Sequence, residues 1–161
     1  MKKKLLVTTD SFLPRWDGIS RFLAIILINL RKKFNITVTA PEFKGRLKKV
    51  EDINIVRFHL MKIRFGDIYF SIPKKMKRLV ADADIIFNQT IGPIGASAIK
   101  NAKRQGKPIV SYVHSIEWEL ASKSVKRFKK IVEWWVKKRA KRLYNKCNLI
   151  LVPSREVGYI L

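Results

Sequence analysis

The chain has 161 residues, about the length of one domain, and 47% of them are hydrophobic, which is enough for a buried core and excludes intrinsic disorder. Its 35 basic and 12 acidic residues give a formal net charge of +23. A charge of that size favours a polyanionic partner, either nucleic acid or the anionic face of a membrane.

The longest apolar run, residues 22–28, is too short to cross a bilayer, which takes about 20 residues. The start, MKKKLLV, is basic and then apolar like a secretory signal, but Thr8, Thr9 and Asp10 interrupt the apolar run. We therefore expect a cytoplasmic location. A single cysteine and two histidines exclude a multi-cysteine zinc site, and no metal ligands are predicted.

Six short apolar segments are predicted to be strands, and helical patterns lie between them. In chain order the predicted strands are residues 5–9, 36–40, 53–58, 85–88, 109–113 and 149–152. The predicted helices are residues 19–33, 73–81, 95–105 and 122–146. Strands that alternate with helices indicate a parallel sheet with helices on both faces. The predicted fold class is therefore α/β, a single Rossmann-like domain.

The segment that follows the first strand, TTDSFLPRWDGISRFL, is the first candidate for a ligand site, because ligands of open α/β sheets bind beyond the carboxyl ends of the strands. Gly18 directly precedes the first predicted helix, where backbone amides can approach a phosphate. An ordinary turn glycine fits this position equally well. The full GxGxxG pattern is absent, which weighs against NAD or FAD.

Four segments in the order TDSFLPRWDGISRFL, ITVTAP, GKPIVSYVHSIEWEL and NLILVPS resemble the N-terminal domain of family 4 glycosyltransferases, which have the GT-B fold. The resemblance spans nearly the whole chain. It implies transfer of a hexose from a nucleotide-sugar donor to an acceptor without a further cofactor, with this domain holding mainly the acceptor. Many family members act on lipid acceptors, so it also implies a lipid-linked acceptor and a peripheral location on the inner face of the cell membrane.

The resemblance also implies roles for individual residues. His114, in SYVHS, matches the histidine that lines the reaction centre and is the implied catalytic residue. Gly18 matches the glycine whose loop approaches the donor diphosphate, although Asp17 stands where the family often has Gly or Asn. A second departure is Asn88-Gln89, where the family often has His-x-His-like residues. The first loop adds these implied substrate-binding residues: Asp10, Arg15, Trp16, Asp17 and Ser20.

Three of the candidates also have alternatives that come from the residues themselves. A histidine such as His114 at a strand end either contacts a sugar hydroxyl and moves a proton, or is structural and bonded to backbone. Glu117 either positions an acceptor hydroxyl or caps the following helix. Gly92, in the loop QTIGPIGAS, either lines the acceptor cleft or cradles an anion, or belongs to an ordinary strand-to-helix connection.

The second Rossmann domain of the family, with its Glu-containing donor motif, has no counterpart in the 161 residues. We therefore expect residues 1–161 to be one GT-B half that needs a donor-binding C-terminal domain or a separate subunit. By the resemblance it is a hexosyltransferase domain, but it is expected to be incomplete as an isolated enzyme. We predict that Gly18, Gly92 and His114 line one cleft at the ends of the first, fourth and fifth strands.

Residues 122–146, predicted as one helix, contain eleven basic residues and one acidic residue. Val125, Phe128, Val132, Val136, Ala140 and Leu143 fall on one side of that helix. Trp134 falls among lysines on the opposite side, as in interfacial membrane contacts. Base stacking on single-stranded nucleic acid and a solvated face with one stray tryptophan are the alternatives. The predicted membrane-binding residues are Arg127, Lys130, Trp134, Lys137, Lys138 and Lys141.

A second membrane candidate is the segment RFHLMKIRFGDIYFSIPKKMKRL, which fits a membrane-dipping loop as well as a buried strand. The leading interpretation is the acceptor-binding half of a membrane-peripheral glycosyltransferase. One alternative is a non-catalytic membrane-docking subunit of a split glycosyltransferase. The other, which the sequence favours less, is a basic nucleic-acid-binding α/β module.

Overall fold

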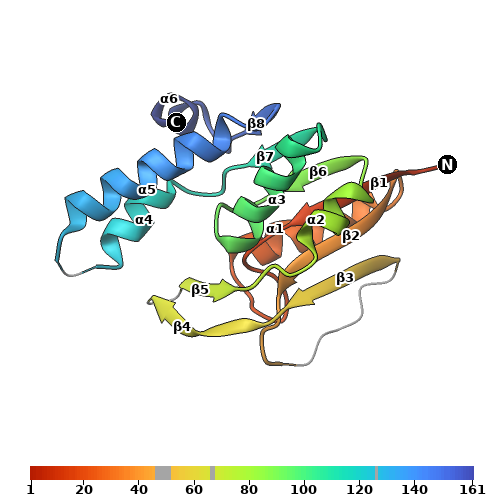
Figure 1. Ribbon diagram of the computed structural model, residues 1–161, viewed down its shortest axis with the longest axis horizontal. Coiled ribbons are helices and arrows are strands. Elements are labelled where there is room, and N and C mark those ends of the chain that lie inside the picture. The colour runs from red at the N-terminus through yellow and green to blue at the C-terminus, as the bar shows by residue number, and fades with distance from the viewer. Residues whose placement is uncertain (46–51, 66–67, 126) are drawn as a thin grey trace.

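A parallel six-stranded sheet forms the centre of the molecule in the computed structural model, which describes residues 1–45, 52–65, 68–125 and 127–161 (Figure 1). The strand order is β3-β2-β1-β6-β7-β8, and each neighbouring pair is parallel. All six predicted strands are confirmed, with small differences at their ends. They are β1 (Lys3–Thr8), β2 (Phe34–Pro41), β3 (Ile53–Phe58), β6 (Ile85–Asn88), β7 (Ile109–Tyr112) and β8 (Leu149–Leu151).

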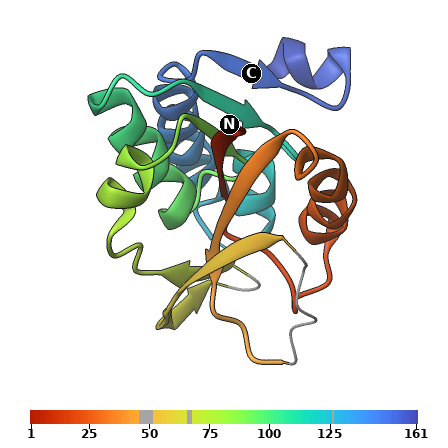
Figure 2. The same cartoon turned by 90° about the vertical axis from the view of Figure 1, so that its right-hand side faces the viewer.

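Helices cover both faces of this sheet. α1 (Gly18–Leu30) lies on one face, and α2 (Met76–Ala81), α3 (Pro93–Arg104) and α5 (Lys129–Tyr144) lie on the other (Figure 2). The chain moves outward from β1 through β2 and β3, and then outward from β6 in the opposite direction. This reversal between β1 and β6 is the topological switch point of a doubly wound fold. The predicted Rossmann-like α/β class is confirmed.

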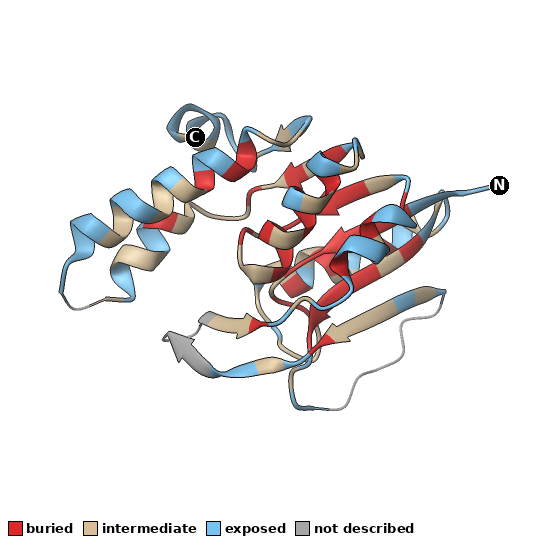
Figure 3. Cartoon of the chain, in the orientation of Figure 1, coloured by how far each residue is buried: buried red, intermediate tan, exposed pale blue. Residues whose placement is uncertain are grey.

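Each face of the sheet has its own hydrophobic core, and the buried residues concentrate on the strands and the helix faces turned toward them (Figure 3). On the α1 face, Leu23 and Leu27 pack with strand residues such as Val7. On the other face, Ile99 of α3 packs with strand residues such as Ile86. Because both faces are covered, the strands read as continuous apolar runs, which is why the sequence revealed them.

The helix predicted over residues 122–146 is confirmed for α5 (Lys129–Tyr144), but its start was wrong, because residues 122–123 end a separate helix. α4 (Glu117–Lys123) and α5 pack against each other as a helical hairpin that extends beyond the sheet (Figure 1). The hydroxyls of Ser122 and Ser124 hydrogen-bond to backbone carbonyls of α4, which competes with continuation of the helix. Phe128 then has a left-handed backbone, with φ of 59°, before α5 begins.

A small antiparallel sheet lies beside the main one. It consists of β4 (Leu60–Phe65) and β5 (Ile68–Ser71). The segment predicted as a membrane-dipping loop or a buried strand therefore contains these two strands and the start of α2, and its contact with a membrane stays a prediction. Residues 66–67 between them, and residues 46–51 of the polar stretch before β3, lie outside the described residues. The chain ends in α6 (Arg155–Ile160), whose first turn is capped by Ser154.

Candidate functional site

Asp10, directly after β1, connects the first loop to the start of α3. Its carboxylate accepts a hydrogen bond from the Thr90 hydroxyl at 2.6 Å and from the backbone N–H groups of Ile94 at 2.9 Å and Gly95 at 3.2 Å. Burial raises the pKa of Asp10, and these hydrogen bonds and the Arg139 charge oppose the rise. The first N–H groups of α3 are therefore satisfied by a carboxylate of the chain itself.

Gly92 and Gly95 are explained by this close packing. A Cβ atom at Gly92 would lie 2.4 Å from the Asp10 carboxyl carbon, and one at Gly95 would lie 1.7 Å from the Thr90 carbonyl oxygen. Neither position has room for a side chain. The loop is a tight strand-to-helix connection whose helix start is occupied by an internal carboxylate, and the role of Gly92 in an acceptor cleft stays a prediction.

His114 follows β7 and faces the loop after β6. Its Nε2 atom lies 3.0 Å from the side-chain carbonyl oxygen of Gln89, and its ring packs edge-on against Phe22 of α1 at 4.9 Å. Tyr112 lies on a further side, with ring centroids 4.6 Å apart. Burial lowers the pKa of His114 to about 4, and the negative charge of Asp17 opposes this shift. The imidazole is therefore neutral at physiological pH.

Asp17 is the N-cap of α1, next to Gly18. Its carboxylate accepts a hydrogen bond from the Ser20 N–H at 2.9 Å and another from the Ser11 hydroxyl, and it forms an ion pair with the Arg15 Nε at 3.1 Å. Burial alone raises the pKa of Asp17, but the hydrogen bonds from Ser11 and Ser20 and the Arg15 charge hold it below its usual range. Gly18 is exposed, and a Cβ atom there would meet nothing within 4 Å.

Arg15 and Trp16 lie at the tip of the first loop and differ in their contacts: Arg15 packs on aromatic rings, whereas Trp16 is largely exposed to solvent. The Arg15 guanidinium lies 5.4 Å from the Tyr69 ring centre and 5.7 Å from that of Phe43, so it also connects the loop to β5. Trp16 is 60% exposed, with the Arg21 guanidinium 5.7 Å from its ring centre. Trp16 therefore presents a largely accessible aromatic surface beside Asp17.

Glu117 bridges the two helices of the helical hairpin. One oxygen of its carboxylate accepts a hydrogen bond from the Tyr144 hydroxyl of α5, while the other oxygen is buried and has no partner among the described residues. Burial raises the pKa of the Glu117 carboxyl. The structure places this side chain between α4 and α5, where its hydrogen bond goes to Tyr144, whereas that of His114 goes to Gln89.

The predicted residues lie beyond the carboxyl ends of β1, β6 and β7 in two groups. Asp10 packs against Gly92, and Asp17 caps α1 next to Gly18, holds the Ser20 N–H and acts by its charge on His114. Three residues that were not predicted hold members of this set: Gln89 contacts His114, Thr90 donates to Asp10, and Ser11 donates to Asp17. Gln89 is one of the two residues that depart from the family pattern after the fourth predicted strand, and that departure was the available signal. The hydroxyls of Thr90 and Ser11 had no signal in the sequence.

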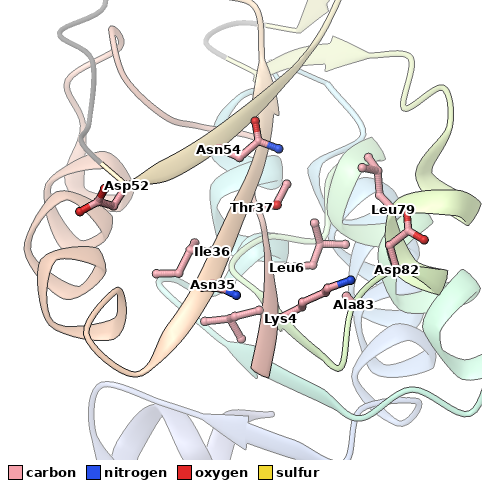
Figure 4. Close-up of a pocket in the computed structure, with 11 residues that line it drawn as sticks. Lys4, Leu6, Asn35, Ile36, Thr37, Asp52, Asn54, Leu79, Asp82 and Ala83 are labelled. Carbon is pink, nitrogen blue, oxygen red and sulfur yellow. The ribbon is translucent and has the colours of Figure 1, made fainter. Parts of the chain in front are cut away.

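A hollow of about 640 Å³ lies elsewhere, at the amino edge of the sheet (Figure 4). It is lined by Lys4 and Leu6 of β1, Thr37 of β2 and Asn54 of β3, with Asp82 beside α2. None of the predicted site residues lines it. Among the described residues, no group of three or more His, Cys, Asp or Glu side chains is arranged to hold a metal ion.

The helical hairpin carries exposed apolar residues among its basic residues, and we call this area the hairpin surface. Phe128 is 73% exposed, although the helical projection placed it on the buried side, because the break before α5 turns it outward. Lys137 is half-buried over the Trp118 ring, unlike the other predicted lysines. We define the hairpin surface by nine of the exposed residues of the helical hairpin: Leu120, Arg127, Phe128, Lys130, Ile131, Trp134, Trp135, Lys138 and Lys141.

Within the described part of the chain, no helix has both the length and the apolar character needed to cross a membrane. Trp134 is 60% exposed, with the Lys138 ammonium 4.7 Å from its ring centre. The aromatic rings and ammonium groups of the hairpin surface are thus intermixed on the outside of α5.

Comparison with known proteins gives a family and two structural neighbours. The profile named Glycosyltransferase Family 4 matches residues 16–161. A solved structure of an alpha-glucosyltransferase in complex with UDP and a 13-mer DNA containing an HMU base is 12% identical, with a TM-score of 0.49, over 94% of this chain and 38% of that chain. A mutated uronate dehydrogenase is 17% identical, with a TM-score of 0.41, over 70% of this chain and 39% of that chain.

The chain thus spans less than two fifths of the length of each of these two proteins. No curated protein matches it. The family profile covers nearly the whole chain, including Asp17, Gly18 and His114 at the carboxyl edge. The chain therefore belongs to glycosyltransferase family 4, in which it forms a Rossmann-like N-terminal domain.

Proposed function

We propose that this domain is the acceptor-binding half of a glycosyltransferase that moves a hexose from a nucleotide-sugar to a lipid-linked acceptor at an anionic membrane surface. The observation that carries the proposal lies at the switch point, where Asp17 and Gly18 at the start of α1 are near His114 after β7: the charge of Asp17 acts on His114, and Phe22 of α1 packs against its ring. Ligands of doubly wound folds bind at this position.

Gly18 and Ile19, the first residues of α1, carry backbone N–H groups that have no partner within the helix. Asp17 takes only the N–H of Ser20 among the first amides. The space around Gly18 leaves room for a diphosphate to approach these N–H groups, which favour negative charge. In sugar transfer this charge grows on the departing diphosphate, so the helix start stabilises the leaving group.

His114 is suited to contact a sugar hydroxyl. It is neutral, since burial lowers its pKa to about 4, and it is held in place by Gln89 and by Phe22. A fixed, neutral imidazole hydrogen-bonds a hydroxyl without the cost of desolvating a charge. Its role in the proposal is therefore to orient the sugar during transfer.

The hairpin surface supplies the proposed membrane contact. Exposed tryptophan and phenylalanine side chains reach the headgroup region, while lysines and arginines attract anionic lipid at about 1 kcal/mol each. The formal net charge of +23 adds a long-range attraction to the same surface. In this arrangement the chain binds as a peripheral protein on the inner face of the cell membrane.

The test is transfer by this chain co-expressed with a donor-binding GT-B domain. Radiolabelled nucleotide-hexoses serve as donors and extracted membrane lipids as acceptors. We expect labelled lipid with the wild type and a loss of at least about tenfold in rate for His114→Ala, the scale of one lost hydrogen bond to a buried group.

His59→Ala is the matched control, because His59 is the other histidine of the chain, is exposed, and follows the edge strand β3, two strands away from β1, where it pairs with Glu42. It should transfer at the wild-type rate. Equal rates for His114→Ala and His59→Ala would contradict the proposed site, and transfer that ignores every lipid acceptor would contradict the proposed substrate class.

A further inference from the structure

Gln89 occupies an unusual position for an amide side chain. It follows β6 directly, and its backbone N–H donates to the Thr8 carbonyl of β1 at 2.9 Å, so its backbone is fixed by the sheet. Its side chain is only 1% exposed. The carbonyl oxygen of that side chain contacts His114, while its Nε2 is buried with no partner among the described residues.

A buried amide with an unpaired N–H group is costly, because the group loses its hydrogen bonds to water and gains none in return. Methionine would fill the same space without that cost. Packing alone therefore gives no reason for glutamine at this position. The part of the side chain that makes a directed contact is the carbonyl oxygen, and the atom that it contacts is Nε2 of His114 at 3.0 Å.

The direction of this hydrogen bond follows from chemistry. A side-chain carbonyl oxygen only accepts, so the Nε2 atom of His114 must carry the proton and donate it. In a neutral imidazole the other nitrogen, Nδ1, then has the lone pair. Phe22 and Tyr112 pack against the ring and keep it from turning over.

We propose that Gln89 is a positioning residue that fixes His114 as the Nε2–H tautomer, so that Nδ1 is presented as a hydrogen-bond acceptor for a hydroxyl of the sugar substrate. The assignment of the hydroxyl rests on the proposed function, whereas the tautomer is a property of the chain alone. The two parts therefore have separate tests.

The charged and titratable groups around the ring are few. Asp17, ahead of α1, is the charged group whose field acts on His114, and Tyr112 of β7 is its titratable ring neighbour. Replacing the neutral Gln89 by glutamate would add a second negative charge at 3.0 Å. It should keep the proton on Nε2 and raise the pKa of His114.

The experiment is NMR of the full chain labelled with ¹⁵N-histidine, in which the two ring nitrogens have different shifts when protonated and unprotonated. In the wild type we expect His114 as the Nε2–H form alone at neutral pH. Gln89→Met should give a mixture with a measurable Nδ1–H fraction. Gln89→Glu should restore the Nε2–H form and raise the midpoint of the His114 titration by at least one pH unit.

His59 gives an internal control in the same spectra, since it is remote and its signals should stay unchanged in both variants. A mixed tautomer in the wild type, or a wild-type ratio in folded Gln89→Met, would overturn the proposal. The wild-type spectrum tests the tautomer even where one variant fails to fold, and the other variant then tests the role of Gln89. A fixed tautomer without sugar transfer would leave the role of Gln89 standing and reject the proposed function.

Discussion

At the residue scale, three glycines near the carboxyl edge are glycine for different reasons. Gly92 and Gly95 have no space for a Cβ atom, because the Asp10 carboxylate and the Thr90 carbonyl oxygen fill it. Gly18 has nothing within 4 Å of that position. Packing therefore explains why positions 92 and 95 hold glycine. It does not explain Gly18, for which the proposed function gives the reason: a diphosphate that approaches the start of α1.

This difference predicts opposite results for two identical substitutions. Gly18→Ala should fold with unchanged or slightly higher stability, since alanine is favoured over glycine in a helix by up to about 1 kcal/mol. Gly92→Ala should lower the free energy of unfolding by about 1–3 kcal/mol through overpacking. Urea denaturation of both variants measures this.

In the enzyme completed with a donor domain, Gly18→Ala should weaken donor binding while Gly92→Ala acts mainly through stability. If Gly18→Ala leaves the affinity for the donor unchanged, the start of α1 does not bind the donor diphosphate.

The buried histidine gives a pH dependence of known sign. Burial lowers the pKa of His114 to about 4 in the folded chain, against 6.5 for a free histidine side chain. The unfolded chain binds more protons between these values, so the contribution of His114 to stability is present above pH 6.5 and falls as the pH drops toward 4.

Asp10 and Glu117, with raised pKa values, change stability in the opposite direction, so the comparison must be between variants. The wild type should lose more stability than His114→Gln between pH 6.5 and 4, as measured by urea denaturation at each pH. Parallel curves for the two proteins would show that the histidine is not desolvated.

At the element scale, the sequence predicted the parallel sheet because β1, β6 and β7 contain continuous apolar runs and alternate with helical patterns along the chain. The positions of the strands also gave the positions of their carboxyl ends, and ligands of parallel α/β sheets bind at that edge. The sequence did not predict the break between α4 and α5, because the break depends on serine hydroxyls bonded to carbonyls and on the left-handed Phe128.

The side-chain partners within the site were also beyond prediction. The residues that hold Asp10 lie 80 or more positions away along the chain, as Thr90, Ile94 and Gly95 do. Periodicity reports which face a residue occupies, but not which side chain of another strand it meets. Gln89 was noticed only as a departure from a family pattern, and its contact with His114 required the fold.

The hairpin surface predicts how the domain meets a membrane. Lys130, Lys138 and Lys141 are exposed, whereas Lys137 is half-buried over Trp118, so the three exposed lysines are the ones to change. Replacing them with glutamate should reduce binding to anionic vesicles by at least about a hundredfold, because about 1 kcal/mol is lost per lysine. Sedimentation with phosphatidylserine-containing vesicles, and with phosphatidylcholine vesicles alone, measures this.

The matched control is the triple substitution of Lys33, Lys77 and Lys100 by glutamate, which changes the net charge equally at exposed positions outside the helical hairpin. It should retain most of the binding. Equal losses in the two triple variants would show that net charge alone drives association. Tighter binding to single-stranded DNA than to anionic vesicles at equal salt would favour the nucleic-acid alternative.

At the scale of the whole molecule, the 161 residues form one Rossmann-like domain with its candidate site at an open edge of the sheet. In the proposed function a second domain covers that edge and holds most of the nucleotide. The isolated chain should therefore bind a nucleotide-hexose with a Kd weaker than about 1 mM, equivalent to less than about 4 kcal/mol, and should transfer no sugar.

Calorimetry of the purified chain with UDP-glucose and the corresponding GDP, ADP and TDP sugars tests this expectation. Micromolar affinity for one of them, or transfer by the chain alone, would mean that the domain holds the donor by itself. The acceptor-binding assignment would then be wrong.

The carboxylate of Asp10 at the start of α3 has a consequence for hydrogen exchange. The first amides of a helix ordinarily exchange quickly with solvent, because they have no partner within the helix. In α3 the amides of Ile94 and Gly95 are bonded to the half-buried Asp10 carboxylate, so they should exchange far more slowly than the uncapped first amides of a helix. α5, whose start has no side-chain cap, should lose its first amide hydrogens, such as that of Lys130, within the earliest time points. Deuterium uptake would then distinguish a rigid helix start beside the site from a loosely held one on the hairpin surface.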